Sequence, residues 1–173
     1  QTASGCEGSK STITVTVNAL PVAPSSTSSI EYCKDATATA LTATASGGHT
    51  LVWYGTDGTT VLSGAPTPST GSVGSTNYYV AQQNTTTGCE GAKTTITVTV
   101  NALPVAPTAT TTVDYCQDAT ATALTATASS GHTLVWYGTD GTTVLSGAPV
   151  PPTSTAGSTN YYVAQENTLT GCE

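Results

Sequence analysis

The sequence carries very little charge and has no arginine. Charged residues make up only 8% of it, and three lysines stand against ten acidic residues, which gives a formal net charge of −7. Binding to nucleic acid and docking on anionic membranes both depend on clusters of Lys and Arg, so this composition argues against either partner. No apolar run approaches the roughly 20 residues that cross a bilayer, so we expect no membrane insertion in this segment.

Phenylalanine and methionine are also absent, which leaves little apolar bulk for a core. Thr, Ser, Ala, Val and Gly replace them, and Thr and Val favour pleated, half-buried surfaces. Such a Thr-rich composition could belong to a disordered, mucin-like stalk, but the apolar residues recur with the spacing of strands. No window shows the periodicity of a helix, so the sequence predicts an all-β fold.

The chain repeats itself with a period of 83 residues. Cys6, Cys89 and Cys172 are separated by this offset, and so are Trp53 and Trp136. Roughly four-fifths of the aligned positions are identical, which is the signature of tandem modules. A module of this size, with turn signals every few residues, predicts a small β-sandwich, with a partly open barrel as the alternative.

A proline-containing connector marks the boundaries between modules. The sequence NALPVAP occurs at residues 18–24 and again at residues 101–107, and its two prolines suit a stiff, extended linker. We therefore expect the C-terminal strand region of a preceding module at residues 1–20 and a complete module at 24–103. Residues 107–173 are expected to form a module that lacks its last strand. This phase is typical of a segment taken from a longer repeat array.

Strand and turn signals divide the complete module into short elements. The clearest strand is residues 94–100 (TTITVTV), where apolar residues and threonines alternate strictly. Asp57-Gly58 is a strong hairpin signal. The other expected strands are residues 28–33, 39–45, 50–54, 60–62 and 76–82. The equivalent of the last strand in the preceding module is residues 12–17.

Five cysteines is an odd number, which the repeat helps to explain. Each module contributes one cysteine near its first strand and one before its last strand. We expect the bonds Cys33–Cys89 and Cys116–Cys172, which leaves Cys6 unpaired within this chain. Closing such a loop of about 56 residues would stabilise a thin core by about 4 kcal/mol, and disulfides indicate an oxidising, extracellular setting. No CxxC spacing exists, so we expect no zinc site.

The motifs occur in an order that resembles the immunoglobulin-like repeats of very large cell-surface adhesins of Bacteroidota. The resemblance covers essentially the whole chain. The residues that carry it are Tyr32-Cys33-x-Asp35, Leu51-Val52-Trp53-Tyr54, Asn77-Tyr78-Tyr79-Val80, Gly88-Cys89-Glu90 and Thr95–Val100. The resemblance implies secretion to the cell surface, often by the type IX route, and roles in adhesion, surface gliding or filament formation.

The cysteines depart from the pattern of antibody domains, whose disulfide crosses the core beside a tryptophan. Here the expected bridge would join a loop to a turn at one end of the sandwich. Trp53 and Trp136 are still expected to fill the two cores, with Tyr79 and Tyr162 packed beside them.

Two acidic groups could in principle bind calcium. Asp57-Gly58 and Asp140-Gly141 resemble fragments of a calcium loop, but they lack the Asp-x-Asp-x-Asp ladder and are expected to be hairpin turns. Glu31, Asp35 and Glu90 could gather near the disulfide and hold calcium between modules, although solvated loop charges are the favoured interpretation. We expect no bound metal and no cofactor.

Neither catalysis nor sugar binding has a strong signal. No nucleophile elbow is present, and His49 follows two glycines in a turn, so we expect no catalytic residue and no enzyme. Tyr54, Tyr78 and Tyr79 could form a patch on which sugars stack, but packing in the core is favoured.

Two functional hypotheses follow for the modules. In the first, they are structural spacers in a long extracellular stalk or filament, because near-identical copies suit repetition. In the second, each module binds surface glycans weakly and acts by multivalency. The partners are adjacent repeats, either on one covalent chain, which we favour, or on separate copies joined by exchange of the Thr12–Val17 strand.

Overall fold

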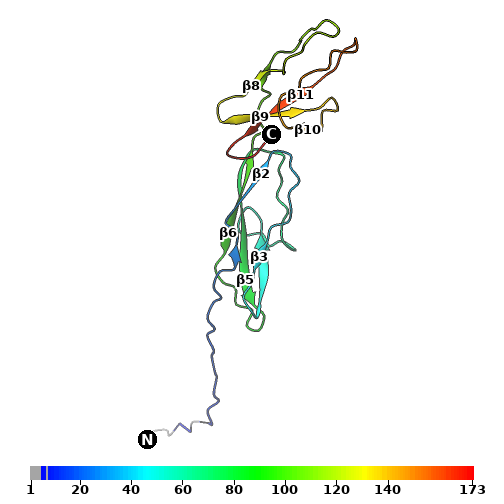
Figure 1. Cartoon of the computed structure of the whole chain (residues 1–173). Helices are drawn as coiled ribbons and strands as arrows, with labels where there is room; N and C mark the ends of the chain where they lie inside the picture. The colour runs from blue at the N-terminus through cyan, green and yellow to red at the C-terminus, as the bar shows by residue number, and fades with distance from the viewer. Residues whose placement is uncertain (1–4, 7) are drawn as a thin grey trace.

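The computed structural model describes Gly5, Cys6 and residues 8–173, and within them the chain is all-β. Figure 1 shows two bodies that follow one another along the chain, and residues 8–20 extend away from the first. The strands of the first module are β1 (Ser25–Ser26), β2 (Ser29–Cys33), β3 (Ala43–Thr44), β4 (His49–Tyr54), β5 (Gly74–Asn84) and β6 (Thr94–Asn101). Those of the second are β7 (Thr108–Ala109), β8 (Ala126–Thr127), β9 (His132–Tyr137), β10 (Val144–Leu145) and β11 (Tyr162–Asn167).

The first module is a sandwich of a four-stranded and a two-stranded sheet. The larger sheet has the order β2-β6-β5-β4, and β1 pairs with β3 in the smaller one. β5 is antiparallel to both of its neighbours, whereas β2 runs parallel to β6. The core between the layers consists of Leu41, Trp53, Val80, Ile96 and Val98. Because β6 lies between β2 and β5, it holds the larger sheet together.

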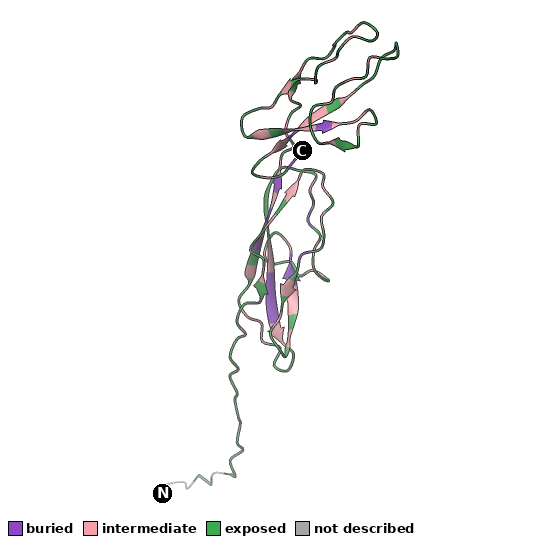
Figure 2. Cartoon of the chain, in the orientation of Figure 1, coloured by how far each residue is buried: buried purple, intermediate pink, exposed green. Residues whose placement is uncertain are grey.

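β6 forms for the reason that the sequence indicates. Ile96, Val98 and Val100 face the core with exposed fractions of 0%, 1% and 4%, and the threonines between them lie on the other face. Figure 2 shows the resulting purple segments concentrated on the strands of the first module. The expected strands at residues 39–45 and 60–62 are shorter in the structure. The first is reduced to β3, and the second to a single bridge between Val61 and Tyr54.

The expectation for the core tyrosines is wrong by one residue along β5. Tyr78 packs against the core cluster, together with Val80 on the same face of the strand. Tyr79 points to the opposite face, where its ring lies against Gly58 of the Asp-Gly turn. In the second module, Tyr162 is 48% exposed. Successive residues of a strand alternate between its faces, so only one of two adjacent tyrosines can enter the core.

The second module has the same plan but fewer paired strands. Its larger sheet has the order β10-β9-β11, and Trp136 is buried within the module. Residues 112–116 and 157–161 form no strand, although their equivalents in the first module belong to β2 and to the start of β5. Both equivalents pair with β6, and residues 107–173 contain no strand in that position. Leu124 is accordingly only partly buried, whereas its equivalent Leu41 is buried.

The strand expected at Thr12–Val17 does not form in the structure. No neighbouring strand lies beside this segment, so its backbone groups have no ladder to join. Ile13, Val15 and Val17 are 87%, 81% and 91% exposed. Residues 1–4 and Glu7, which belong to the expected strand region at 1–20, lie outside the described residues.

Candidate functional site

The two modules are joined covalently, and their junction is the most distinctive site of the molecule. A disulfide links Cys33, the last residue of β2, to Cys172 in the turn after β11, with the two Cα atoms 5.5 Å apart. Figure 1 shows the C-terminus beside the end of β2. The expected pairs Cys33–Cys89 and Cys116–Cys172 are therefore wrong. Cys89 and Cys116 are free thiols, and so is Cys6.

The geometry of the sheet explains why Cys33 cannot reach Cys89. Cys33 lies opposite Asn101, at the far end of β6, whereas Cys89 precedes Thr94, at the beginning of β6. Eight strand residues at about 3.3 Å each place these ends roughly 23 Å apart. A disulfide needs Cα atoms about 4.4–6.8 Å apart. The two cysteines of one module thus lie at opposite ends of its larger sheet.

The repeat therefore places complementary cysteines at facing ends of consecutive modules. The Gly-Cys-Glu turn has the same backbone hydrogen bonds in both modules. The Asn84 amide donates to the carbonyl of Cys89 at 2.9 Å, and the Asn167 amide donates to that of Cys172 at 2.8 Å. Gly88 and Gly171 allow this turn, because they adopt φ values of 71° and 67°. The turn of the second module thus presents its cysteine to the end of β2 in the first.

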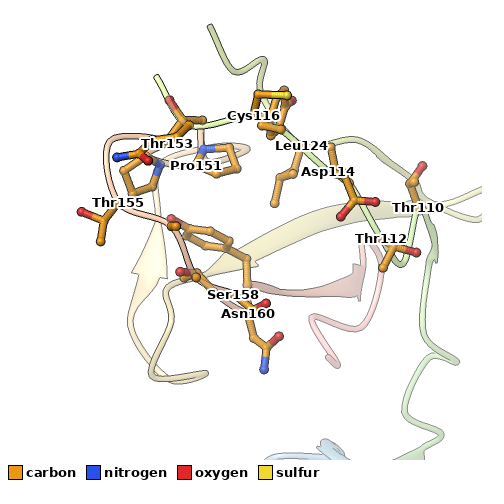
Figure 3. A pocket seen from close by; sticks show the side chains of 18 of the residues that line it. Thr110, Thr112, Asp114, Cys116, Leu124, Pro151, Thr153, Thr155, Ser158 and Asn160 are labelled. Atoms are coloured by element: carbon orange, nitrogen blue, oxygen red, sulfur yellow. The ribbon is translucent and has the colours of Figure 1, made fainter. Parts of the chain in front are cut away.

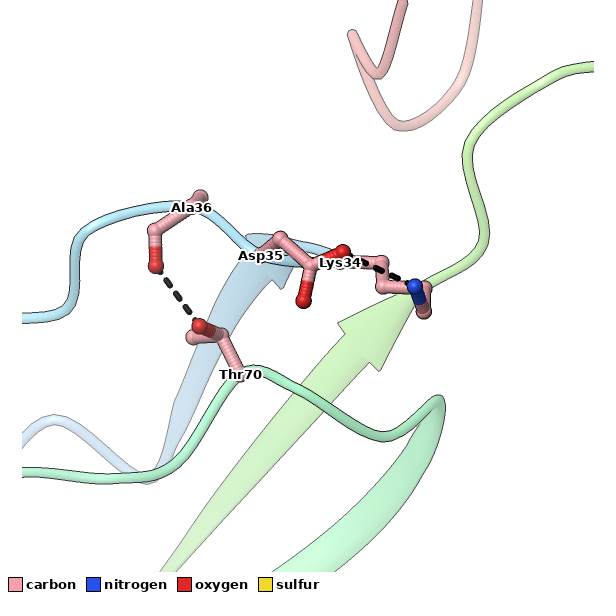
Figure 4. A network of polar contacts seen from close by, with 4 residues as sticks. All are labelled: Lys34, Asp35, Ala36 and Thr70. Atoms are coloured by element: carbon pink, nitrogen blue, oxygen red, sulfur yellow. Dashed lines mark hydrogen bonds and ion pairs between the residues drawn. The ribbon is translucent and has the colours of Figure 1, made fainter.

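The Tyr-Cys-x-Asp motif forms a tight turn that positions Cys33. The Ala36 amide donates to the carbonyl of Cys33, and the Asp35 amide donates to the carbonyl of Thr70. Figure 4 shows the Thr70 hydroxyl, which donates to the Ala36 carbonyl at 2.7 Å, and the ion pair between Lys34 and Asp35. Asp35 has a φ of 63°, which is unusual for a residue other than glycine. The equivalent Asp118 has a φ of 61°, so both modules use this turn.

A buried glutamine fixes the linker before each module. Gln82 is fully buried in the first module, where its Oε1 accepts from the Ser46 amide and its Nε2 donates to the Val22 carbonyl at 2.7 Å. In the second module, Gln165 is 2% exposed and donates to the Val105 carbonyl at 2.6 Å. A buried amide needs its hydrogen-bond partners, so each glutamine holds its linker segment in one place. Neither glutamine was predicted from the sequence, although a glutamine within the apolar pattern of β5 and β11 was a usable signal.

Glycine and threonine add two further contacts to the linker of the first module. A Cβ placed on Gly91 would lie 2.2 Å from the Pro21 carbonyl oxygen, so only glycine permits this close approach. The Thr94 hydroxyl donates to the Pro24 carbonyl at 2.7 Å. Residues 21–24 thus run along the module and do not hang free from it.

A tyrosine and a glutamate stabilise each Gly-Cys-Glu turn. The Tyr54 hydroxyl donates to Glu90, and the Tyr137 hydroxyl donates to Glu173. Lys93 lies over the ring of Tyr54, with its Nζ 3.5 Å from the ring centroid. Burial, followed by the hydrogen bond to Glu90 and its negative charge, raises the pKa of Tyr54 to about 12. The hydrogen bond to Glu173, followed by burial, raises the pKa of Tyr137 to about 12.

The raised pKa values of Tyr54 and Tyr137 predict that alkaline pH destabilises both modules. The ordinary pKa of tyrosine is about 10, so between pH 10 and 12 the folded state keeps protons that the unfolded state releases. The free energy of unfolding should therefore fall as pH rises through this window. Denaturation at a series of pH values, with the free thiols alkylated, measures the slope. Tyr54→Phe should reduce it, and so should Tyr137→Phe, because each removes a tyrosine whose pKa is raised in the folded state. Equal slopes in all three chains would contradict the assignment.

The candidate calcium ligands do not come together. Asp57 accepts from the Thr60 hydroxyl at 2.5 Å and from the Thr59 and Thr60 amides, and these bonds hold its pKa well below the usual range. Asp140 does the same in the equivalent turn. Glu90 accepts from Tyr54, at the opposite end of the sheet from Asp35. Within residues 5, 6 and 8–173, no three His, Cys, Asp or Glu residues gather in a group that could hold a metal ion.

The other sequence candidates are also distributed over the module. Tyr54 is buried and Tyr78 packs against the core, so no flat aromatic patch forms from them. The Nδ1 atom of His49 lies 2.9 Å from the Gly47 carbonyl oxygen within its own turn. The described part of the chain also contains no helix that could cross a membrane.

The comparisons with known proteins agree with this architecture. Two tandem segments, residues 21–102 and 104–173, match the family described as "Ig-like domain CHU_C associated". Domains of this family are typically non-catalytic. The comparison with curated proteins found no match. Because the two matched ranges together cover most of the chain, it belongs to the CHU_C-associated family of Ig-like domains, of which it contains two tandem copies.

Proposed function

We propose that the chain is a non-catalytic structural segment of a long extracellular filament or stalk on a bacterial surface, built from near-identical Ig-like modules. The observation that carries this proposal is the bond between Cys33 and Cys172, which links one module to the next. A disulfide within a module would stabilise that module alone. A disulfide between modules restricts their relative rotation, which is the property that a stalk requires.

Non-covalent contacts support the same role. Gln165 fastens the linker to the second module through the Val105 carbonyl. On the other side of the linker, the Lys34 amide donates to the carbonyl of Asn101 at 2.8 Å, which ties the ends of β2 and β6 together. The linker therefore has both of its ends attached, and the disulfide joins the two modules beside its first end, where Cys33 lies opposite Asn101.

An extracellular location and adhesion are part of the proposal. Disulfides persist in oxidising compartments, which favours secretion over the cytosol. The low charge and the threonine-covered strands suit a surface with few specific contacts. The family name and the resemblance to Bacteroidota surface adhesins support placement at the cell surface.

The competing hypothesis of a glycan-binding module receives less support. Its strongest candidates were the tyrosines, but Tyr54 is buried beneath Lys93 and Tyr78 packs against the core. Binding of the chain to a glycan array would revive this alternative.

Nuclear magnetic relaxation of backbone amides tests the structural role. In the oxidised chain, we expect both modules to show one shared rotational correlation time, because the disulfide and the fixed linker make them tumble as one body. Reduction should allow the modules to tumble separately. The Cys89→Ser variant is the matched control, since it keeps the bond between the modules. Separate correlation times in the oxidised chain would count against a role as a rigid spacer.

A further inference from the structure

The bond between Cys33 and Cys172 creates a short covalent route through the molecule. The two residues have a sequence separation of 139, yet their Cα atoms lie 5.5 Å apart. A force that enters the chain before Cys33 and leaves it after Cys172 crosses directly from one sulfur to the other. The chain between the two cysteines, which contains every strand from β3 to β11, lies on a side branch of this route. Tension on the route therefore does not have to pass through those strands.

The part of the route before Cys33 spans the first module from end to end. Gln82 donates to the Val22 carbonyl, and the Thr94 hydroxyl donates to the Pro24 carbonyl, so the linker is held where β6 begins. From there the backbone runs through β1 and β2 to Cys33, at the opposite end of the larger sheet. Figure 1 shows the N-terminal segment at one end of this module and the end of β2 at the other. Covalent bonds thus cross the whole length of the module.

Without the disulfide, the same force would act on the pairing between β2 and β6. The pull would reach β2 through its N-terminal end and β6 through its C-terminal end. The two strands are parallel, with five paired positions from Ser29 opposite Thr97 to Cys33 opposite Asn101. Opposed pulls on parallel strands shear the hydrogen bonds between them. Once these bonds break, the first module would unfold and the chain would lengthen.

The disulfide itself is shielded from reduction. Cys172 has an exposed fraction of 0%, and Cys33 is partly buried. A thiolate breaks a disulfide by attack on one of its sulfur atoms, so the rate depends on access to them. Burial of the Cys172 side chain blocks approach to its sulfur and helps the bond to persist.

We propose that the segment bears tension, and that a pull along the chain passes through residues 21–33 and the disulfide and bypasses the strands between Cys33 and Cys172. The inference rests on the proposed structural role. It adds that the two modules keep their length when the chain is pulled from its ends. Their core packing and their hydrogen bonds then serve to hold the covalent route in place, and they carry little of the force.

Single-molecule force spectroscopy tests the bypass. The oxidised full-length chain, with its free thiols alkylated, is held by handles at its two termini and stretched. Once the segment before the first module is taut, the chain should lengthen by no more than about 40 Å, because residues 21–33 are the folded part of the route. A larger unfolding step in the oxidised chain would overturn the proposal.

Cys33→Ser removes the covalent route. At full stretch, this variant should be longer than the parent by about 480 Å, since a sequence separation of 139 then extends at up to about 3.5 Å per residue. The difference in stretched length does not depend on whether the second module still folds. An unchanged stretched length would show that the disulfide does not carry the force.

Cys116→Ser is the matched control. Cys116 is the repeat equivalent of Cys33 and is a free thiol. It precedes the equivalent turn, in which the Asp118 amide donates to the Thr153 carbonyl at 3.0 Å. Figure 3 shows Cys116 and Thr153 among the side chains that line a pocket of the second module. This variant should keep the short stretched length of the parent. A gain in length equal to that of Cys33→Ser would contradict the assigned route.

A change of attachment point separates the bypass from mechanical strength of the modules. Thr86 is exposed in the turn after β5, within the bypassed part of the chain. One handle is attached through Thr86→Cys, in a chain whose other free cysteines are replaced by serine, and the second handle at the N-terminus. The force must now cross strands of the first module. The oxidised chain should therefore unfold and release roughly 180 Å, which corresponds to the residues between Cys33 and Thr86.

The result can be told apart from that of the relaxation experiment. If the first module resists the pull at Thr86 up to the same force as the pull from the termini, its strands bear the load and the bypass is wrong. One shared correlation time, together with stepwise unfolding under a pull from the termini, would leave the spacer role intact and refute the bearing of tension alone.

Discussion

Replacing Cys33 with alanine is expected to lower the free energy of unfolding of the second module by about 4 kcal/mol. The first module holds Asn101 beside Cys33, through the hydrogen bond from the Lys34 amide. When the second module unfolds with the disulfide intact, the chain from Asn101 to Cys172 becomes a closed loop of about 70 residues, and its entropy is limited accordingly. Without the bond this restraint on the unfolded state is lost, and the second module, with its partly exposed Leu124, should unfold more readily.

Hydrogen exchange followed by mass spectrometry can measure this effect in each module separately. Amides of β9 and β11 that exchange through unfolding of the second module should lose about a thousandfold of their protection, since each 1.4 kcal/mol corresponds to a factor of ten. Amides of β4, β5 and β6 should change little. Reduction of the unmodified chain should reproduce the result, and Cys6→Ser should have no effect. Unchanged protection in β9 and β11 after loss of the bond would show that the disulfide does not stabilise the second module.

Sequence periodicity was sufficient for the elements in which one face meets the core. β6 was predictable because Ile96, Val98 and Val100 alternate with threonines, and only a strand places all three on one side. The turn at Asp57-Gly58 was predictable from its residue types, and Gly58 has the positive φ that such turns use. The face taken by adjacent tyrosines was not predictable in this way, because Tyr78 and Tyr79 are equally apolar and only the register of β5 decides between them.

The disulfide could not be assigned from the repeat alone. Cys33, at the end of the first long strand, pairs with a cysteine of a Gly-Cys-Glu turn. The repeat permits this partner to lie in the same module, as Cys89, or in the next, as Cys172. The choice depends on the parallel pairing of β2 with β6, which places Cys33 at the end of the sheet remote from Cys89. Parallel pairing between the first and last strands of a sheet leaves no mark in the local sequence. The odd number of cysteines is compatible with both pairings.

The buried glutamines were missed for a different physical reason. Binary patterns treat glutamine as a surface residue, because an amide is costly to bury without partners. Gln82 has these partners in the Ser46 amide and the Val22 carbonyl, which come from segments distant in sequence. The available signal was a polar residue that occupies a core position in both copies of the repeat. Such a residue affects the orientation of the modules, because it bonds to the linker, as well as the stability of each module.

Replacement of Gln82 with leucine should therefore destabilise the first module by about 2–4 kcal/mol, although the new side chain is apolar and of similar size. The Ser46 amide and the Val22 carbonyl would each lose a partner, and an unsatisfied buried group costs about 1–3 kcal/mol. Chemical denaturation followed by Trp53 fluorescence in a Trp136→Phe chain reports on this module alone. Gln83→Leu is the matched control, because its side chain makes a single, more exposed hydrogen bond to the Gly88 carbonyl. If both leucine variants lie within about 0.5 kcal/mol of the parent, the linker is held by Gly91 and Thr94 without help from the glutamine, and the junction depends on the disulfide more heavily than the buried amides indicate.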